Sequence, residues 1–302
     1  MKSQFEVIII GGSYAGLSAA MSLGRAMRNV LVIDSGLPCN RQTPQSHNVI
    51  TLDGEKPADI AAKARDQVLQ YPTVQLINDV AVNGRKTDRG FEIGTRSGKV
   101  YMAEKLIFAA GVKDLMPDIP GFAECWGISV IHCPYCHGYE VRNTKTGILG
   151  NGDAAFHYAQ LIRNWSEDLT IFTNGTSAFT AAQAEILSRH SIPVIEKEIQ
   201  KISHHEGMLH ELVFSDGSVE ELKAMYSRPP SEQHCTVPEM LGCEMTEHGL
   251  IAVDAFQKTT LQNVMACGDC ATPFRSVAAA IYSGNLAGAM LNNRMTEEAF
   301  AR

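Results

Sequence analysis

A glycine-rich turn directly after a buried strand is the feature that most constrains how this chain can fold. Residues 7–10 are all apolar, which is typical of a parallel strand buried on both faces, and Gly11-Gly12-Ser13-Tyr14-Ala15-Gly16 follows at once. A helical pattern comes next, and a second apolar run at 30–33 ends at Asp34. This order of strand, glycine turn, helix, strand and acid predicts a βαβ dinucleotide-binding unit.

Each residue type in this motif has a physical task. Gly11 permits a tight turn, a small residue at Ser13 lets a pyrophosphate approach the backbone, and Gly16 lets the helix pack closely on the strand. Asp34 lies 23 positions after Gly11, where a carboxylate can bind a ribose hydroxyl. An ordinary strand-turn-helix with incidental glycines is the alternative. The residues predicted to bind the cofactor here are Gly11, Gly12, Ser13, Ala15, Gly16 and Asp34.

The same kind of motif occurs a second time. Gly150-Asn151-Gly152-Asp153-Ala154-Ala155 follows a strand-like run and precedes a helix-like stretch at 156–164 and a strand at 169–172. Two such units imply two dinucleotides, and Gly150, Gly152 and Ala155 are predicted to bind NADPH or NADH. The second strand, however, leads into Thr173-Asn174-Gly175, which offers neither an acid for a ribose hydroxyl nor an arginine pair for a 2′-phosphate. A domain that keeps the fold but binds dinucleotides poorly is therefore the alternative.

The length of the chain and its proline- and glycine-rich breaks predict two domains. At about 150 residues per domain, 302 residues suggest two. A strand-like run at 105–108 leads into Ala109-Ala110-Gly111, and the breaker-rich stretch 116–121 predicts a crossover between domains. Another strand and Gly-Asp at 263–269 precede a small-residue helix at 276–291 that suits burial against the first domain. We predict an α/β fold with two Rossmann-like domains, in which the second (116–246) is inserted into the first (1–115 and 247–302).

Composition and charge exclude several partners. The chain is 45% hydrophobic and 20% charged, with a formal net charge of −7, so an electrostatic interaction with nucleic acid or an anionic membrane is not expected. The N-terminal apolar run is far shorter than the roughly 20 residues of a membrane span, and no secretory signal is readable. We expect a cytoplasmic protein.

The eight cysteines predict chemistry rather than structural disulfides, because the cytoplasm is reducing. If Cys133-Pro134-Tyr135-Cys136 opens a helix, the helix dipole and a protonated His137 would stabilise a thiolate. Cys133 and Cys136 are therefore predicted to carry thiol-disulfide exchange, with His137 moving protons. A zinc site shared with Cys267 and Cys270 is the alternative, although a whole nucleotide fold separates the two pairs. No metal is expected, and the isolated cysteines are expected to be small hydrophobic residues: Cys39, Cys125, Cys235 and Cys243.

His47 lies in a polar, irregular segment, 39–48, inside the predicted first domain. Such a segment can contact a cofactor, and a plain surface loop is the alternative. His47 is included among the predicted cofactor-binding residues.

Together the motifs resemble the low-molecular-weight thioredoxin reductase family of the pyridine nucleotide-disulfide oxidoreductases, over almost the whole chain. The N-terminal glycine motif, Ala109-Ala110-Gly111 before Pro120-Gly121, Cys-x-x-Cys before the second glycine motif, and Ala266-Cys267-Gly268-Asp269 stand in the family's order. The resemblance implies FAD in the first domain, NADPH in the second, and a homodimer. It also implies that Cys136 faces the flavin while Cys133 exchanges with a thioredoxin-like protein or a small-molecule disulfide or dithiol. Further FAD-binding residues implied by the resemblance are Gly111, Gly268, Asp269, Ser276 and Val277.

Two departures from the family pattern introduce alternatives. His137 stands where the family typically has Asp, and 173–176 replaces an expected arginine cluster. The Cys-Pro-x-Cys-His-Gly form is similar to dithiol oxidases of the gliotoxin and holomycin type, which close disulfides in small molecules and pass electrons through FAD to oxygen. We predict an FAD-dependent thiol-disulfide oxidoreductase. The alternatives are an oxygen-dependent dithiol oxidase with little or no NAD(P)H use, and a flavin-binding redox sensor without turnover.

Overall fold

The computed structural model describes residues 3–301, which divide into two compact units. The first unit comprises the residues up to Arg41, Glu55–Lys113, and those from Ser231 onward; the second comprises Gln42–Gly54 and Asp114–Pro230. The predicted α/β fold, with one unit inserted into the other, is confirmed. Three stretches lie in the other unit than predicted: 231–246 packs with the first unit, whereas 42–54 and 114–115 pack with the second.

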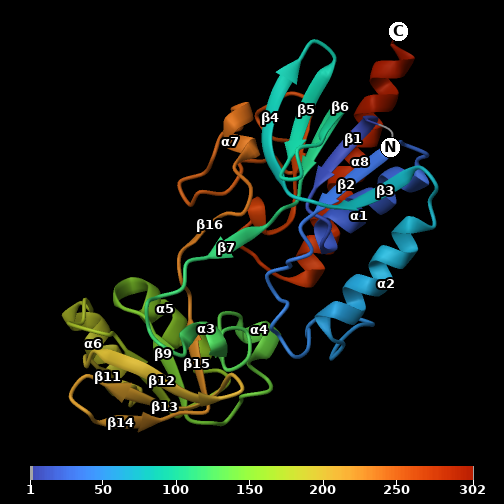
Figure 1. Ribbon diagram of the computed structural model, residues 1–302. Helices are drawn as coiled ribbons and strands as arrows, with labels where there is room; N and C mark the ends of the chain where they lie inside the picture. The colour runs from blue at the N-terminus through green and yellow to red at the C-terminus, as the bar shows by residue number, and fades with distance from the viewer. Residues whose placement is uncertain (1–2, 302) are drawn as a thin grey trace. The chain divides into compact units, whose positions relative to one another are not determined.

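A seven-stranded sheet forms the centre of the first unit (Figure 1). Its strand order is β3-β2-β1-β6-β5-β4, and β17 also pairs with β6. The bounds are β1 Gln4–Ile10, β2 Val30–Asp34, β3 Val74–Asn78, β4 Ala81–Thr87, β5 Gly90–Thr95, β6 Val100–Phe108 and β17 Val264–Ala266. The strands β3, β2, β1, β6 and β17 run parallel, whereas β5 pairs antiparallel with both β6 and β4. The apolar run of β1 lies in the middle of the sheet, where Val7, Ile8 and Ile9 are fully buried.

Two helices of the first unit pack closely because small residues line their contact. These are α1 (Tyr14–Arg25) and α8 (Val277–Phe300), while α2 (Pro57–Leu69) also packs on α1. A side chain at Gly284 would meet the backbone of Ala15, and Ser18 Oγ donates to the carbonyl of Ile281 at 2.7 Å. The predicted small-residue helix is thus buried against the first nucleotide motif.

Residues 231–246 join the first unit through its core. The short helix α7 (Val237–Leu241) packs on β4, and Val237 is fully buried there. Cys235 and Cys243 lie in the same apolar cluster, and Cys125 is buried in the core of the second unit, in line with the prediction that isolated cysteines are small hydrophobic residues. Cys39 departs from that prediction, because it is exposed. Two short strands, β7 (Val112–Asp114) and β16 (Ser231–Gln233), pair with each other at the crossovers.

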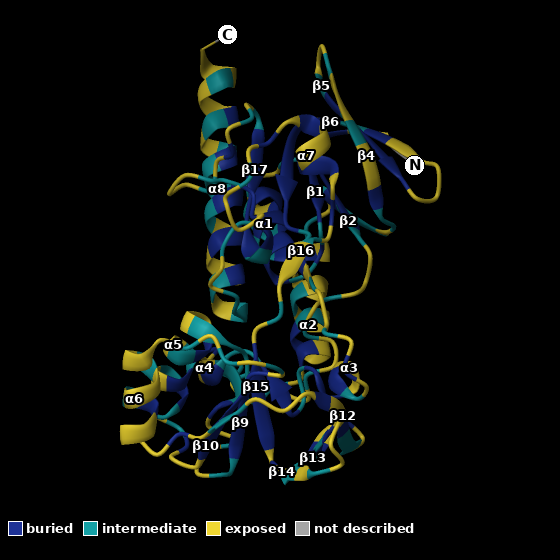
Figure 2. Cartoon of the chain, turned by 90° about the vertical axis from the view of Figure 1, so that its left-hand side faces the viewer, coloured by how far each residue is buried: buried dark blue, intermediate teal, exposed yellow. Residues whose placement is uncertain are grey.

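The second unit combines a parallel and an antiparallel sheet. The parallel sheet has the order β11-β10-β9-β15-β8, and its strands β9, β10 and β15 are largely buried (Figure 2). Its strands are β8 (Val130–Ile131), β9 (Thr146–Leu149), β10 (Leu169–Phe172), β11 (Val194–Ile195) and β15 (Ala224–Ser227). The antiparallel strands are β12 (Ile199–His205), β13 (Met208–Phe214) and β14 (Val219–Glu221). The helices are α3 (Phe122–Cys125), α4 (Pro134–His137), α5 (Gly152–Ile162) and α6 (Ala181–Arg189).

A buried lysine on the sheet of the first unit forms an ion pair with the end of α8. Lys105 on β6 is 4% exposed, and its ammonium group pairs with Glu298 and donates to Asn263 Oδ1 at 2.8 Å. Arg294 Nε also donates to Glu298, at 3.0 Å. The Lys105 hydrogen bond is the main reason that the pKa of Glu298 lies below its usual value.

We expect Glu298→Ala to lower the free energy of unfolding by about 2 kcal/mol, because it leaves a buried ammonium short of a counter-charge while Glu298 itself is partly exposed. Glu297→Ala, at an exposed neighbour, is the matched control. Since the folded pKa of Glu298 is depressed, this contribution is present above the pKa of an unfolded glutamate and is lost as pH falls through the folded value. Urea unfolding at neutral and acidic pH measures both effects, and equal losses in the two variants would contradict the assignment.

Among residues 3–301, no helix is both long and apolar enough to span a bilayer.

Candidate redox-active site

The first glycine motif forms a close cradle at the end of β1. Gly11 has φ +104°, and a side chain there would run into the carbonyl of Ala109. A side chain at Gly16 would collide with the carbonyl of Gly11, so glycine is needed at both positions. Asp34 ends β2 and turns toward the cradle, where its Oδ1 accepts from Gly12 N at 2.9 Å. The sequence-predicted residues are therefore brought together.

The start of α1 is open to an anion. Ser13 is the N-cap but makes no side-chain capping bond within the described chain, and the first turn carries no acidic residue. The amides of this turn and the helix dipole together favour a phosphate. These features fit the pyrophosphate and ribose of a dinucleotide such as FAD.

The predicted residues near the C-terminus lie at the same edge of the sheet as the first glycine motif, because β17, β6 and β1 are parallel and end side by side. Asp269 lies in the 3-10 helix η1 (Gly268–Cys270), and its Oδ2 lies 3.3 Å from Arg275 Nε. Ser276 caps α8 by accepting from Ala279 N at 3.1 Å, which places Val277 at the first turn. Gly111, just after β6, has a positive φ of 68°. Asp269 and the start of α8 thus form a polar edge suited to a cofactor.

Cys267 and Cys270 are fully buried beside this edge. Burial raises the pKa of the Cys270 thiol to about 12 and raises that of Cys267 well above its usual value. Both therefore remain neutral thiols at physiological pH and are poor nucleophiles. Within residues 3–301, no group of three or more His, Cys, Asp or Glu side chains is placed to hold a metal ion.

Cys133 and Cys136 form a disulfide at the start of α4, with Cα atoms 5.2 Å apart. The chain leaves β8 in an extended conformation, Cys133 is the N-cap, and Pro134 occupies the first turn. The fixed φ of proline suits this first helical position. The cysteine pair does open a short helix, which was the condition attached to the predicted stabilisation of a thiolate, and both cysteines are half-buried.

His137 is held in a desolvated position at the end of α4. Both imidazole nitrogens are buried, and neither has a hydrogen-bond partner of ordinary geometry among the described residues. Burial lowers the pKa of His137, and the Glu140 carboxylate opposes this shift; nearby His47 lowers the pKa further, while the Gln45 backbone raises it. A neutral imidazole beside the disulfide is suited to accepting a thiol proton.

His47 lies with the second unit and not with the first glycine motif. It belongs to 42–54, and its Nε2 lies 3.5 Å from Glu140 Oε1, in the turn after α4. The predicted boundaries placed this segment in the first domain, and Glu140 was not among the predicted site residues. Its spacing of three residues from His137 was the available signal, because residues so spaced share one side of a helical turn.

Aromatic side chains surround the cysteine pair within the second unit. Tyr135, between the two cysteines, is exposed and packs edge-on against Trp165 with ring centroids 5.3 Å apart. Tyr139 is also exposed, and Arg142 lies over its ring at 3.8 Å. The segment that bears the disulfide therefore exposes two aromatic side chains, one in α4 and one just after it.

The second glycine motif differs from the first at its helix start. Asn151 caps α5: its Oδ1 accepts from Gly152 N at 2.8 Å and from Ala178 N at 2.7 Å. Asp153 stands in the first turn and accepts from Gln183 Nε2 at 2.7 Å. Gly150, Gly152 and Ala155 occupy their predicted places. However, the side-chain cap and the carboxylate make this helix start less suited to a phosphate than that of α1.

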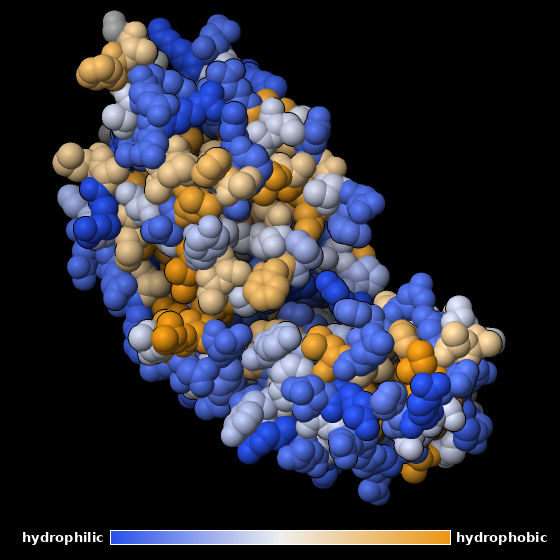
Figure 3. Space-filling model, turned by 180° about the vertical axis from the view of Figure 1, so that it is seen from behind, coloured by the Kyte–Doolittle hydropathy of each residue, from blue (hydrophilic) through white to orange (hydrophobic). Residues whose placement is uncertain are grey.

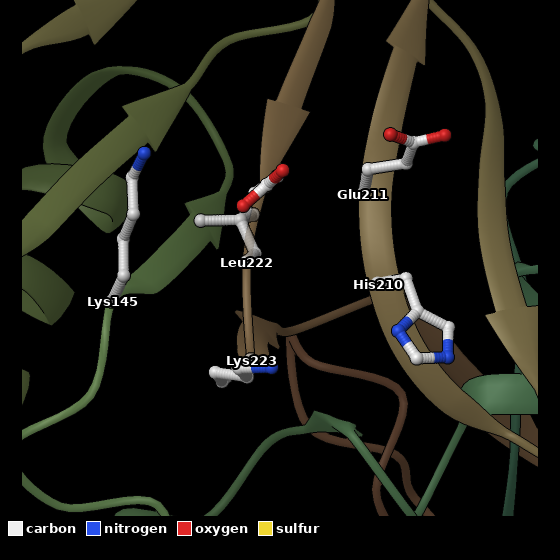
Figure 4. Close-up of a pocket in the computed structure, with 6 residues that line it drawn as sticks. Lys145, His210, Glu211, Leu222 and Lys223 are labelled. Atoms are coloured by element: carbon white, nitrogen blue, oxygen red, sulfur yellow. The ribbon is translucent and has the colours of Figure 1, made fainter.

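A separate pocket of about 310 Å³ opens on the second unit (Figure 4). It is lined by Lys145, His210, Glu211, Glu221, Leu222 and Lys223. Lys145 is already paired with Glu220 at 2.6 Å. None of the predicted site residues lines this pocket, so it does not belong to the disulfide site.

Comparison with known proteins places these features in one class, the disulfide oxidoreductases of the thioredoxin reductase type. The profile of the pyridine nucleotide-disulphide oxidoreductases matches residues 5–284, and the chain belongs to this family. Thioredoxin reductase tcpT of Claviceps purpurea is 33% identical, covering 96% of this chain and 94% of its own length. Thioredoxin reductase sirT of Leptosphaeria maculans is 31% identical with the same two coverages. The crystal structure of the oxidoreductase from Agrobacterium tumefaciens has a TM-score of 0.90 at 38% identity, covering 97% of this chain and 99% of that one.

Proposed function

We propose that the protein is an FAD-dependent thiol-disulfide oxidoreductase that exchanges two electrons with its substrate through Cys133 and Cys136. The observation that carries the proposal is the disulfide on the first turn of α4 beside the buried His137. A helix start and a neighbouring imidazole are the surroundings that activate a thiol.

Gly11, Gly12, Ser13, Ala15 and Gly16 would hold the FAD pyrophosphate, with Asp34 on the ribose. Further FAD contacts are proposed at Gly111, Gly268, Asp269, Ser276 and Val277, whereas the role expected for His47 as an FAD contact is not proposed again, because its ring faces Asp53 and Glu140 in the second unit. When bound, FAD supplies a two-electron acceptor and donor for the cysteine pair. We assign Cys136 to the flavin side and Cys133 to the substrate side.

The cysteines themselves perform the exchange with substrate. In the reductive direction the Cys133 thiolate attacks a substrate disulfide and forms a mixed disulfide; Cys136 then attacks Cys133, which closes the Cys133–Cys136 bond and releases the second substrate thiol. Two protons pass from the enzyme thiols to the substrate sulfurs, and His137 moves them. In the oxidative direction the same steps reverse, and a substrate dithiol leaves as a disulfide.

A second candidate, oxygen-dependent oxidation of a small-molecule dithiol, is supported by the second glycine motif. The Asn151 cap, the Asp153 carboxylate, and the absence of a cationic side chain from 173–176 all weaken binding of NADPH or NADH. The substrate would be a small dithiol, whereas a thioredoxin-like protein is the partner expected for the reductive direction. A flavin-binding redox sensor would contain the same groups without turnover.

Anaerobic titration of the purified flavoprotein separates these functions. We expect a dithiol to bleach the visible flavin absorption and to open the Cys133–Cys136 disulfide, as counted by thiol titration. Fast bleaching by NADPH or NADH would indicate the reductase, whereas bleaching by dithiol alone, with reoxidation by oxygen, would indicate the oxidase. If neither donor changes the flavin or the thiol count, the proposed function is wrong.

We also propose a cytoplasmic homodimer. The first unit exposes large apolar side chains, including Ile281 and Tyr282 on α8, and Figure 3 shows hydrophobic side chains gathered on the displayed face of this unit. Such surface is often covered by a partner. Sedimentation equilibrium of the holoenzyme measures the oligomeric state.

A further inference from the structure

Residues 46–54 form a closed loop that fixes the orientation of His47. Gly54 N donates to the carbonyl of Ser46 at 2.9 Å, which joins the two ends of the loop. Asp53 Oδ1 accepts from Asn48 N at 2.7 Å, and Asp53 Oδ2 lies 3.5 Å from His47 Nδ1. One imidazole nitrogen of His47 is therefore directed at a carboxylate of its own loop.

The other imidazole nitrogen of His47 is directed at the disulfide site. Its Nε2 lies 3.5 Å from Glu140 Oε1, three residues after His137. Glu140 also acts on His137, because its carboxylate raises the pKa that burial lowers. The carboxylate of Glu140 is thus near two imidazoles at once.

We propose that His47 is a positioning residue of the disulfide site, which shares the Glu140 carboxylate with His137 so that the two imidazoles act as one proton-holding unit. The inference rests on the proposed thiol-disulfide chemistry. Two imidazolium ions near one carboxylate repel each other, so a proton arriving on His137 disfavours the proton on His47.

The exposure of the two carboxylates indicates which way protons move through the pair of imidazoles. Both nitrogens of His137 are buried, whereas the side chains of Asp53 and Glu140 are 65% and 38% exposed. When a cysteine S–H bond breaks, the proton moves to His137, and the proton of His47 passes to water beside Asp53 and Glu140. In the reverse direction, His47 takes a proton from water as His137 gives its own to a thiolate. The electron pairs stay in the exchanging S–S bonds, and no further oxidant is needed for this step.

Two buried tyrosines near this pair of imidazoles keep a constant charge. Burial raises the pKa of Tyr226 on β15 and of Tyr158 on α5, while Arg228 opposes the shift at Tyr158. Both phenols therefore stay neutral near physiological pH. The pH dependence of the site is assigned to the imidazoles.

Two substitutions are expected to shift the titration of His137 in opposite directions. His47→Gln removes the competing cation, so proton binding at His137 should become about threefold to tenfold tighter; Glu140→Gln removes the shared carboxylate, so it should become weaker by a similar factor. The measurement is the chemical shift of the His137 ring against pH by NMR on the oxidised holoenzyme. The pH profile of disulfide opening by dithiothreitol should move in the same directions.

His248→Gln is the matched control, because His248 Nε2 lies 3.6 Å from Glu247 in an exposed pair, and it should leave the His137 titration unchanged. Asp53→Asn keeps the acceptor for Asn48 N but removes the charge that favours protonated His47. It should therefore shift His137 in the same direction as His47→Gln, and it tests the same coupling if His47→Gln does not fold. The inference is overturned if His47→Gln and Asp53→Asn match the control, or if Glu140→Gln shifts His137 in their direction. Cysteine variants that retain turnover would instead contradict the proposed function.

Discussion

Cys136→Ser is expected to trap substrate on Cys133 as a stable mixed disulfide and to abolish turnover. The reason is that Cys133 can still attack a substrate disulfide, whereas the sulfur that resolves the adduct is missing. Cys133→Ser should abolish turnover without trapping substrate. The fall in kcat should be as large as that caused by removing a covalent nucleophile, on the order of 10⁶-fold. Intact-protein mass spectrometry with a substrate disulfide, on the reduced variants, detects the adduct.

Cys243→Ala is the control for this experiment, because it removes a buried thiol from the core of the first unit and leaves α4 untouched. It should retain turnover and form no adduct. If the adduct accumulates on Cys133→Ser instead, the roles of the two cysteines are reversed. If both serine variants retain turnover, the proposed function fails.

Gly16→Ala is expected to yield protein without bound FAD. A methyl group at this position would collide with the carbonyl of Gly11, which cannot move without opening the cradle between β1 and α1. We expect FAD binding to weaken by at least about tenfold, which corresponds to about 1.4 kcal/mol of binding free energy, and the flavin-to-protein ratio after purification to fall with it. Visible absorption of the purified protein gives this ratio.

The second glycine motif provides the control for Gly16→Ala. A side chain at Gly150 would meet Ala155 Cβ at 3.4 Å, an ordinary van der Waals distance, and Gly150 has no positive φ. Gly150→Ala should therefore keep its FAD. Equal flavin contents in the two variants would contradict the assignment of FAD to the first motif.

The sequence predicted those parts of the fold that depend on local patterns. The apolar run 7–10, the glycines after it and Asp34 are contiguous signals, and the structure brings them together at one edge of the sheet. The helix at Cys133 was predictable for the same reason, because proline favours the first turn. The FAD-binding residues proposed near the C-terminus followed from family resemblance alone.

The arrangement around His137 depended on contacts that local patterns do not encode. The polar segment 42–54 has no periodicity, so nothing in it indicated that it packs with the second unit. Glu140 meets His47 only through tertiary structure, because the two residues are 93 positions apart in the sequence. The Asn151 cap was equally hidden, because its second bond goes to Ala178, beyond the next strand.

Because residues 42–54 belong to the second unit, this unit cannot be moved to a related protein as one continuous stretch of chain. The chain crosses between the units four times, after Arg41, Gly54, Lys113 and Pro230. A chimaera made by transplanting 114–230 alone would carry the cysteine pair and His137 into a new host, but it would leave behind His47 and Asp53. Any recombination of this unit between related proteins must therefore exchange two separate stretches together, or the recipient's own loop must supply a compatible histidine.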